Sequence, residues 1–218
     1  MHVNNYKGVI MKKKLLAGLA TGVLMLGMAG AVNATNMINN GSFELPALNI
    51  NTWQVFNSIP GEWETISGSG IEIQNNVAGV SYDGFQHVEL DSRSNSAMEQ
   101  EVQTILGQHY NIEFAYSARP NVALSSNWIE VLWNNELVYT VSGRGGANTT
   151  WNLQAFDVFG TGGMDSLVFR AAGTSDSLGG YIDAVSMQPV PEPATMLLMG
   201  TGLAGLVAAN RRRKANKS

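Results

Sequence analysis

The chain has 218 residues, with 13 Lys and Arg against 17 Asp and Glu, and it has no cysteine, which excludes thiol chemistry and zinc-thiolate sites. Nine of the basic residues lie outside residues 35–190 and 16 of the acidic residues lie inside, so this segment carries 4 − 16 = −12 and contains no lysine. Nucleic acid is therefore excluded as a partner, because binding it requires clustered Lys and Arg, whereas a cation or an uncharged ligand such as a sugar remains compatible.

The N-terminal 34 residues have the pattern of a secretory signal peptide. Lys12, Lys13 and Lys14 precede the run "LLAGLATGVLMLGMAGAVNA", which supplies the apolar region and the small residues before a cleavage site. We predict a signal helix over residues 1–34, cleavage after Ala34, and a natural start at Met11. The segment implies export of everything that follows it.

Apolar residues alternate with polar ones through most of residues 35–189. In "HYNIEFAYSA", Tyr110, Ile112, Phe114 and Tyr116 share one face, which is typical of a half-buried strand. Seven further stretches are also predicted as strands, namely "GIEIQ", "FQHVELD", "MEQEVQTI", "NWIEVLW", "ELVYTV", "SLVFRAA" and "YIDAVSM".

Clusters of Gly, Asn, Asp and Ser separate these stretches, as expected of turns. The segment Trp133–Glu136 places two asparagines between strand-like runs and predicts a hairpin. Many short strands without an amphipathic helix indicate an all-β domain, an antiparallel β-sandwich of the jelly-roll kind. By parity, Trp133 faces the core and Trp128 faces outward.

Catalytic patterns are weak in this domain. His87 and His109 are its only histidines, and neither has the spacing of a metalloprotease helix or a nucleophile elbow. A Ser-His-Asp triad assembled from distant residues stays open. Glu99 and Glu101 share one strand face about 7 Å apart, which could suit glycoside hydrolysis, but a solvated outer face explains them more simply. We predict a non-catalytic protein.

Exposed aromatic residues are the better candidates for a binding site, because sugar rings stack on aromatic faces while nearby polar groups bind the hydroxyls. Trp128 lies beside Glu130, and Tyr82 and His87 flank "DG" in a predicted loop. Arg119 could donate a two-pronged hydrogen bond to a sugar or uronate, or could pair with a carboxylate at the sheet edge. We predict carbohydrate binding by Trp128, Tyr82, His87 and Arg119.

A calcium site is the predicted cofactor site, because acidic oxygen ligands without cysteine suit Ca²⁺. Glu44 and Asp183 lie near the first and last strands, which adjoin in many sandwiches, so a cation there would join the two ends of the domain. The alternative is that both carboxylates accept hydrogen bonds from turn amides.

The C-terminal residues 190–218 form a third region. Ala194–Ala209 is apolar and as a helix would extend roughly 24 Å, marginal against a hydrocarbon core of about 30 Å. Arg211, Arg212 and Arg213 follow it with Lys214, and clustered basic residues stay on the cytoplasmic side. We predict a hydrophobic helix that holds the domain outside the inner membrane.

This tail resembles a PEP-CTERM sorting signal in its three ordered parts: Pro191-Glu192-Pro193, an apolar segment and a basic end. The resemblance implies export from a Gram-negative bacterium and transient anchoring in the inner membrane. It further implies cleavage near Pro-Glu-Pro by an exosortase and release to the cell surface or the extracellular polysaccharide matrix.

The domain at 35–189 resembles galactose-binding-like sandwiches of the carbohydrate-binding-module type. The similarity rests on the order of "NGSFELP", "IPGEWE", "GIEIQ", "DGFQHVELDS", "GQHYNIEFAYSARP", "NWIEVLWNNELV" and "GTSDSLGGYIDAVS". It implies a structural Ca²⁺ held by Glu44, Asp183 and the Ser42 carbonyl. Glu62 departs from the usual Pro-Gly-Trp reading before Trp63 and leaves the placement of that tryptophan open.

Three functions follow from these patterns. The preferred one is an exported carbohydrate-binding or polysaccharide-binding module without catalysis. The second is a structural or adhesive protein of the biofilm matrix that has no specific sugar site. The third, and least favoured, is a glycan hydrolase.

Overall fold

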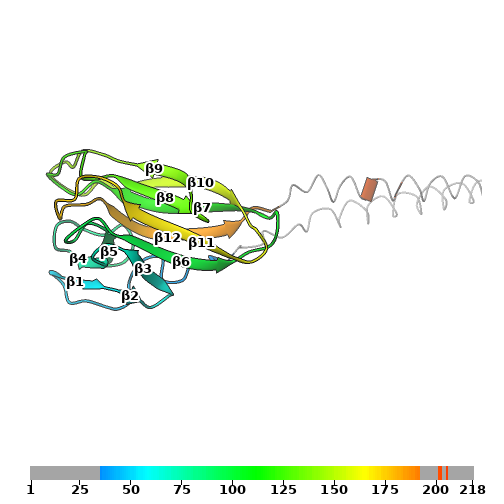
Figure 1. Cartoon of the computed structure of the whole chain (residues 1–218), viewed down its shortest axis with the longest axis horizontal. Coiled ribbons are helices and arrows are strands. Elements are labelled where there is room, and N and C mark those ends of the chain that lie inside the picture. Colours follow the sequence, from blue (N-terminus) through cyan, green and yellow to red (C-terminus); the bar gives the residue numbers. More distant parts are fainter. Residues whose placement is uncertain (1–34, 192–200, 203–204, 206–218) are drawn as a thin grey trace, which may run out of the picture. The chain divides into compact units, whose positions relative to one another are not determined.

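The computed structural model describes residues 35–191, 201–202 and 205. The described residues form two six-stranded antiparallel sheets (Figure 1). Sheet A has the order β1 (Thr52–Phe56), β4 (Ile71–Asn75), β5 (Gln86–Glu89), β12 (Tyr181–Pro189), β7 (His109–Ser117), β10 (Asn152–Phe159). Sheet B has the order β2 (Ser58–Ile59), β3 (Trp63–Ser67), β6 (Ala97–Gln103), β11 (Met164–Ala171), β8 (Ile129–Trp133), β9 (Glu136–Val141).

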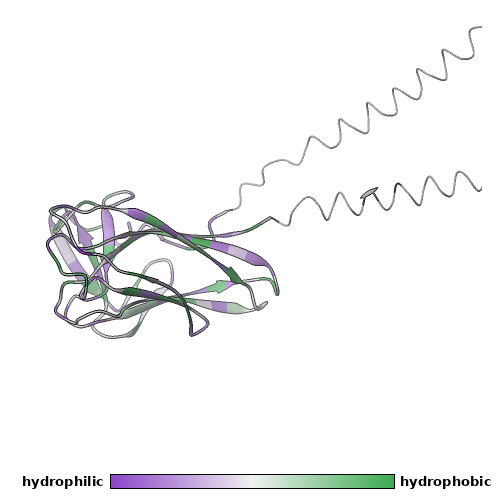
Figure 2. Ribbon diagram, turned by 90° about the horizontal axis from the view of Figure 1, so that it is seen from above, coloured by the Kyte–Doolittle hydropathy of each residue, from purple (hydrophilic) through white to green (hydrophobic). Residues whose placement is uncertain are grey.

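Alternation along the strands builds the core between the two sheets. Figure 2 shows hydrophilic and hydrophobic residues interspersed along the strands. In β7 the even-numbered residues Tyr110–Tyr116 are buried in the core, whereas Glu113 is exposed on the other face. This is the β-sandwich that the sequence predicts, and its fold class is confirmed.

Aromatic rings fill the middle of that core. Trp63 is fully buried, lies 5.7 Å from the ring of Phe43 and 6.1 Å from that of Phe169, and donates its indole N–H to the Asn39 carbonyl at 3.0 Å. Phe169 in turn lies 5.1 Å from Phe114 of the opposite sheet. The inserted Glu62 takes a left-handed φ of 65° and thereby leaves Trp63 in the core.

The predicted hairpin joins β8 and β9. Asn134 and Asn135 have φ angles of 50° and 67°, which is the conformation that a two-residue turn needs and asparagine tolerates. Trp133 is buried and Trp128 is 42% exposed, so both parity predictions are confirmed. In β6 Glu101 is exposed, as the predicted solvated face requires, and Met98, Gln100 and Val102 are buried.

The strands absent from the sequence prediction lie mostly at the sheet edges. β1 and β10 are outermost in sheet A, and β2 with β3 closes one side of sheet B. In β10, Leu153 and Phe159 are 57% and 65% exposed, so the strand has no clean alternation to detect. The predicted signal helix and the helix at Ala194–Ala209 lie outside the described residues, apart from 201–202 and 205. Among the residues described, no helix is long and apolar enough to cross a membrane.

The sandwich has two ends that differ in content. The loop end gathers the connections that follow β5, β7, β9 and β11, namely 90–96, 118–128, 142–151 and 172–180. The exit end gathers the connections 104–108, 134–135 and 160–163, together with both ends of the domain, since Met37 N–H donates to Met187 O and Val190 N–H to His109 O. The loop 76–85 folds back over the outer face of sheet A.

Candidate functional site

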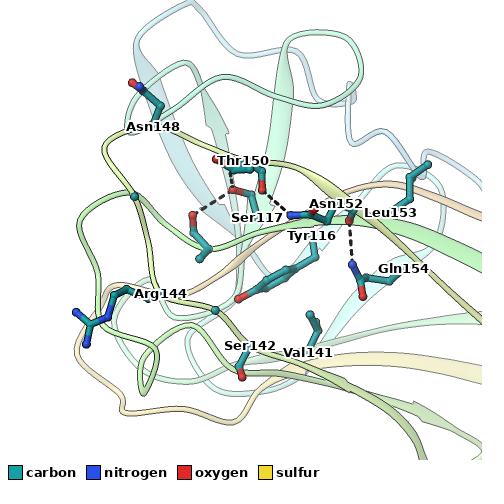
Figure 3. A pocket seen from close by; sticks show the side chains of 13 residues that line it. Tyr116, Ser117, Val141, Ser142, Arg144, Asn148, Thr150, Asn152, Leu153 and Gln154 are labelled. Atoms are coloured by element: carbon teal, nitrogen blue, oxygen red, sulfur yellow. Dashed lines mark hydrogen bonds between the residues drawn. The ribbon is translucent and has the colours of Figure 1, made fainter.

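A polar hollow of about 670 Å³ lies at the loop end between the edge of sheet A and the segment 142–150. Figure 3 shows its lining, which is rich in amide and hydroxyl groups. The lining side chains include Tyr116, Ser117, Val141, Ser142, Arg144, Asn148, Thr150, Asn152, Leu153 and Gln154. Volumes of this order are typical of small-molecule sites, and neutral donors and acceptors suit the hydroxyls of a sugar.

Hydrogen bonds fix the base of this hollow (Figure 3). Thr150 N–H donates to Ser117 Oγ at 3.0 Å, Asn152 Nδ2 donates to Thr150 O at 3.2 Å, and Gln154 Nε2 donates to Asn152 O at 3.2 Å. Gln154 also accepts, through Oε1, a hydrogen bond from the Tyr139 hydroxyl at 2.8 Å. The polar groups are therefore held in place before any ligand arrives, which lowers the cost of ordering them on binding.

A cluster of four rings covers the outer face of sheet A beside the loop end. The ring of His87 lies 4.3 Å from Tyr181 and 5.7 Å from Trp151, and Tyr82 lies 6.2 Å from Trp151. Trp151 donates its indole N–H to Val80 O at 2.9 Å, which fastens the loop 76–85 across the sheet. Val80 and Thr149 also line a second hollow, of about 550 Å³, on this side of the domain.

His87 has the most unusual environment in this cluster. It is fully buried, and within the described residues neither of its ring nitrogens has a hydrogen-bond partner. Burial, and to a smaller extent the charge of Arg119, lower the pKa of His87 to about 3. His87 is therefore a neutral imidazole with an unused donor and acceptor.

An acidic network lies beside the rings on the same face of sheet A. Gln74 Nε2 donates to Glu72 Oε1 at 2.8 Å and to Glu89 Oε2 at 2.6 Å, and Arg119 Nη1 pairs with the same oxygen of Glu89. The guanidinium of Arg119 lies 5.9 Å from the ring centre of Tyr181. Burial raises the pKa of Glu89 above its ordinary value, against the opposing charge of Arg119, and burial also raises the pKa of Glu72.

The two calcium candidates lie beneath the same loop. Asp183 Oδ2 accepts the N–H groups of Tyr82 and Asp83 at 2.8 and 2.9 Å, and Glu44 Oε1 accepts those of Phe85 and Gln86 at 2.7 and 2.9 Å. Both carboxylates thus bond to loop amides, the alternative left open by the sequence. Burial raises the pKa of Asp183 to about 7 despite these hydrogen bonds.

The oxygen atoms of Glu44, Asp183 and Ser42 meet the requirements of a calcium site only in part. Ser42 lies close to Glu44 in the chain, and each carboxylate keeps lone pairs that Ca²⁺ could use. In the part of the chain that the structure describes, however, no group of three or more His, Cys, Asp or Glu is placed to hold a metal ion. Calcium binding by Glu44, Asp183 and Ser42 remains a prediction.

The predicted sugar residues divide between two places. Tyr82, His87 and Arg119 come together around Trp151 and Tyr181 on sheet A. Trp128 precedes β8 in sheet B, where its carbonyl accepts the N–H of Ala172 at 2.9 Å. His87 lies in β5 and not in the predicted loop, because the loop ends at Phe85 and the strand begins at Gln86.

The sequence analysis did not identify several residues of the ring cluster and acidic network on sheet A, namely Glu72, Gln74, Glu89, Trp151 and Tyr181. A signal for the first three existed: "GIEIQ" and "FQHVELD" place a polar residue at every position that faces away from the core. Such a row reads as a solvated face. Contacts from three loops make it a buried polar layer: the loop 76–85 bonds to Asp183 and Trp151, Arg119 pairs with Glu89, and Gly179 N–H donates to Glu89 Oε1 at 2.6 Å.

The predicted processing residues Ala34, Glu192, Pro193, Arg211, Arg212 and Arg213 lie outside the described residues, and Pro191 is the last residue before that gap. Residues 189–213 match the family described as the PEP-CTERM protein-sorting motif. The chain carries a PEP-CTERM motif. It marks an exported protein that is sorted by way of the membrane. The cleavage positions and domain boundaries stay predictions.

The domain is similar to part of two curated toxins, each called multifunctional-autoprocessing repeats-in-toxin. The protein of Vibrio cholerae serotype O1 is 28% identical over 160 residues, which are 71% of this chain and 3% of the toxin. That of Vibrio vulnificus is 27% identical over 164 residues, 73% of this chain and again 3% of the toxin. The chain thus spans about 3% of the length of these relatives.

Two solved structures are similar to the domain. The K1 cleaved adhesin domain of Lys-gingipain from Porphyromonas gingivalis W83 has a TM-score of 0.50 at 16% identity, covering 64% of this chain and 98% of that domain. TmCBM61, solved in complex with β-1,4-galactotriose, has a TM-score of 0.42 at 15% identity, covering 72% of this chain and 100% of that one. The likeness to the adhesin domain supports the sandwich fold alone.

Proposed function

We propose that this protein is an exported, non-catalytic carbohydrate-binding module that binds an uncharged region of a polysaccharide at its loop end. The hollow of about 670 Å³ with its lining of amide and hydroxyl groups is the observation that carries the proposal. Arg144 offers the cationic fork in this lining, and the net charge of −12 over residues 35–190 disfavours a polyanion.

The contacts of three carboxylates support the non-catalytic part of the proposal. Glu72 and Glu89 are buried and share Gln74 as a donor, which leaves them little freedom to act as acid and nucleophile. Glu99 bonds to the Ser166 hydroxyl on the outer face of sheet B. Turnover of a polysaccharide by the purified protein, abolished by changing one of these carboxylates, would contradict this part of the proposal.

The sorting step completes the proposed function. An exosortase-type enzyme of a Gram-negative host cuts near Pro191-Glu192-Pro193 after transient anchoring in the inner membrane, and the domain then reaches the cell surface or the extracellular matrix. Intact-mass spectrometry of the protein from membrane and medium tests this step, because it reads both termini at once. A full-length, uncut chain recovered from cytosol would refute it.

Glycan-array binding by the purified full chain tests the sugar site. Arg144→Ala with Asn152→Ala should lower affinity roughly tenfold or more, since each removes a polar group of the hollow. Arg93→Ala is the matched control, because it removes the same charge from the loop 90–96. An array without any signal, together with an intact biofilm phenotype, would favour the structural or adhesive alternative.

A further inference from the structure

The exit end carries an exposed apolar patch, which we define as Ile105, Leu106, Phe159 and Met164. Their exposed fractions are 69%, 77%, 65% and 53%. Ile105 and Leu106 lie in the loop 104–108, Phe159 ends β10 and Met164 begins β11. Four large apolar side chains exposed at one end of a sandwich are unusual on a soluble surface and indicate a partner surface.

These side chains form one surface because the loops 104–108 and 160–163, beside which they lie, are bonded together. Gly107 N–H donates to Gly160 O at 2.8 Å, and a Cβ added at Gly162 would lie 3.0 Å from Leu106 Cβ. The buried Asp165 fixes the loops from below, accepting from Thr104 Oγ1 at 2.6 Å. It also accepts from Thr161 N–H at 2.9 Å and from Asn134 Nδ2 at 2.9 Å.

The chain leaves the sandwich beside this patch. Gln108 lies in the loop that carries Ile105 and Leu106, and its Nε2 donates to Val190 O at 3.0 Å. The sorting motif spans residues 189–213, and the apolar segment read from the sequence begins at Ala194. The four residue steps from Val190 to Ala194 reach at most about 14 Å when extended. The patch is therefore held close to wherever that segment enters the bilayer.

We propose that the patch rests on the outer surface of the inner membrane while the sorting segment anchors the chain. Phe and Leu side chains gain free energy at the boundary between headgroups and acyl chains. The anchor supplies a high effective concentration, so a weak contact suffices. When cleavage removes the anchor, this contact alone is too weak to retain the domain, and release follows.

The surrounding charge limits the contact to the end of the sandwich. Next to Phe159, Asp157 pairs with His109 at 3.4 Å, and Glu101 is exposed farther along β6. The net charge of −12 over residues 35–190 repels anionic lipid. The domain thus touches the membrane with the patch and keeps its loop end in solution.

Site-specific labelling tests the proposal, because the chain has no cysteine of its own. Leu106→Cys and Leu124→Cys place a single thiol in the patch and in the loop 118–128 at the opposite end. Each full-length variant is labelled with an environment-sensitive fluorophore and reconstituted in vesicles of phosphatidylethanolamine with a minority of phosphatidylglycerol. Lipids carrying a nitroxide quencher then report proximity to the bilayer, whichever way the chain inserts.

We expect quenching and a blue shift at position 106 and neither at position 124. Adding Ile105→Ser and Phe159→Ser to the Leu106→Cys variant should abolish the quenching, whereas adding Leu178→Ser at the loop end should not. Equal quenching at both positions, or none at position 106, would overturn the proposal. Quenching at position 106 that requires membranes containing the processing enzyme would also overturn it, in favour of a protein partner.

Discussion

On β4, β5 and β12 both faces of sheet A are buried, yet they are chemically opposite. The inner face presents aliphatic side chains to the core, namely Ile73, Val88 and Ile182. On the same three strands the outer face presents Gln74, His87 and Tyr181, which are buried as completely. One sheet thus carries an apolar layer and a polar layer of equal depth.

The difference teaches which layer serves stability and which serves recognition. Burying apolar surface stabilises a fold, whereas burying polar groups costs free energy unless their partners are supplied. The outer layer is covered by the loop 76–85 and lies beside the loop end, where the proposed site is. We therefore interpret the outer layer as a support for binding, built at some cost to stability. The predictions below separate the two layers by the size of the effect.

The largest effect is expected from Arg119→Met. The side chain of Arg119 is 18% exposed, and its removal leaves the buried Glu89 without its cation. Breaking such a pair costs about 3–5 kcal/mol of unfolding free energy. Because Glu89 then binds a proton in the folded state at a pH where the unfolded chain is ionised, the variant should lose stability as pH rises.

Urea unfolding at several pH values measures this. The control is Arg119→Met combined with Glu89→Gln, which leaves no charge unpaired and should recover most of the loss. If Arg119→Met alone is as stable as the parent at alkaline pH, the Arg119–Glu89 pair does not stabilise the outer layer.

On the inner face, Ile73→Ala should cost about 2–5 kcal/mol, because it leaves a cavity in the core next to β5. Ile73→Val is the matched control, with about 0.5–1.5 kcal/mol. Thermal unfolding measures the stability of both variants, and glycan binding is measured at a temperature where each variant is folded. Sugar affinity should not change in either variant. A loss of affinity in a folded variant would show that the inner face also contributes to binding.

Calcium removal tests how the loop over the outer face is held. If Glu44 and Asp183 bind the ion, Ca²⁺ at about 100 times its dissociation constant should add roughly 2.7 kcal/mol relative to chelator. Asp183→Asn should remove that increment whatever its effect on the baseline. An identical melting temperature in calcium and in chelator would leave the loop amides as the only partners of these carboxylates.

The sequence predicts the inner layer well, for a physical reason. Residues that face the core must be apolar, so β7 and β8 show the alternation that a strand requires, and Asn134-Asn135 marks the turn. Edge strands such as β10 are exposed on much of their surface and therefore lack that signal.

The outer layer is predictable only residue by residue. Tyr82, His87 and Arg119 are recognisable by type, but their convergence depends on the path of the loop 76–85. Two hydrogen bonds set that path: Trp151 donates to the loop, and Asp183 accepts from it. Both residues lie far from the loop in the sequence. A pattern with period two carries no information about such contacts.

The smallest effect on stability, and the sharpest test of the outer layer, is expected from His87→Phe. The variant keeps the ring contact with Tyr181 and removes two nitrogens that have no partner among the described residues. At neutral pH the unfolding free energy should change by less than about 1 kcal/mol.

At lower pH the same variant should be more stable than the parent. His87 is neutral when folded, with a pKa of about 3, whereas the unfolded chain binds a proton below about pH 6.5. The parent therefore loses stability as pH falls through that range, by about 1.4 kcal/mol at roughly pH 5.5, and the variant does not. Urea unfolding at the two pH values measures this. If glycan affinity also falls in a variant as stable as its parent, the outer layer serves recognition; unchanged affinity would make His87 a packing residue.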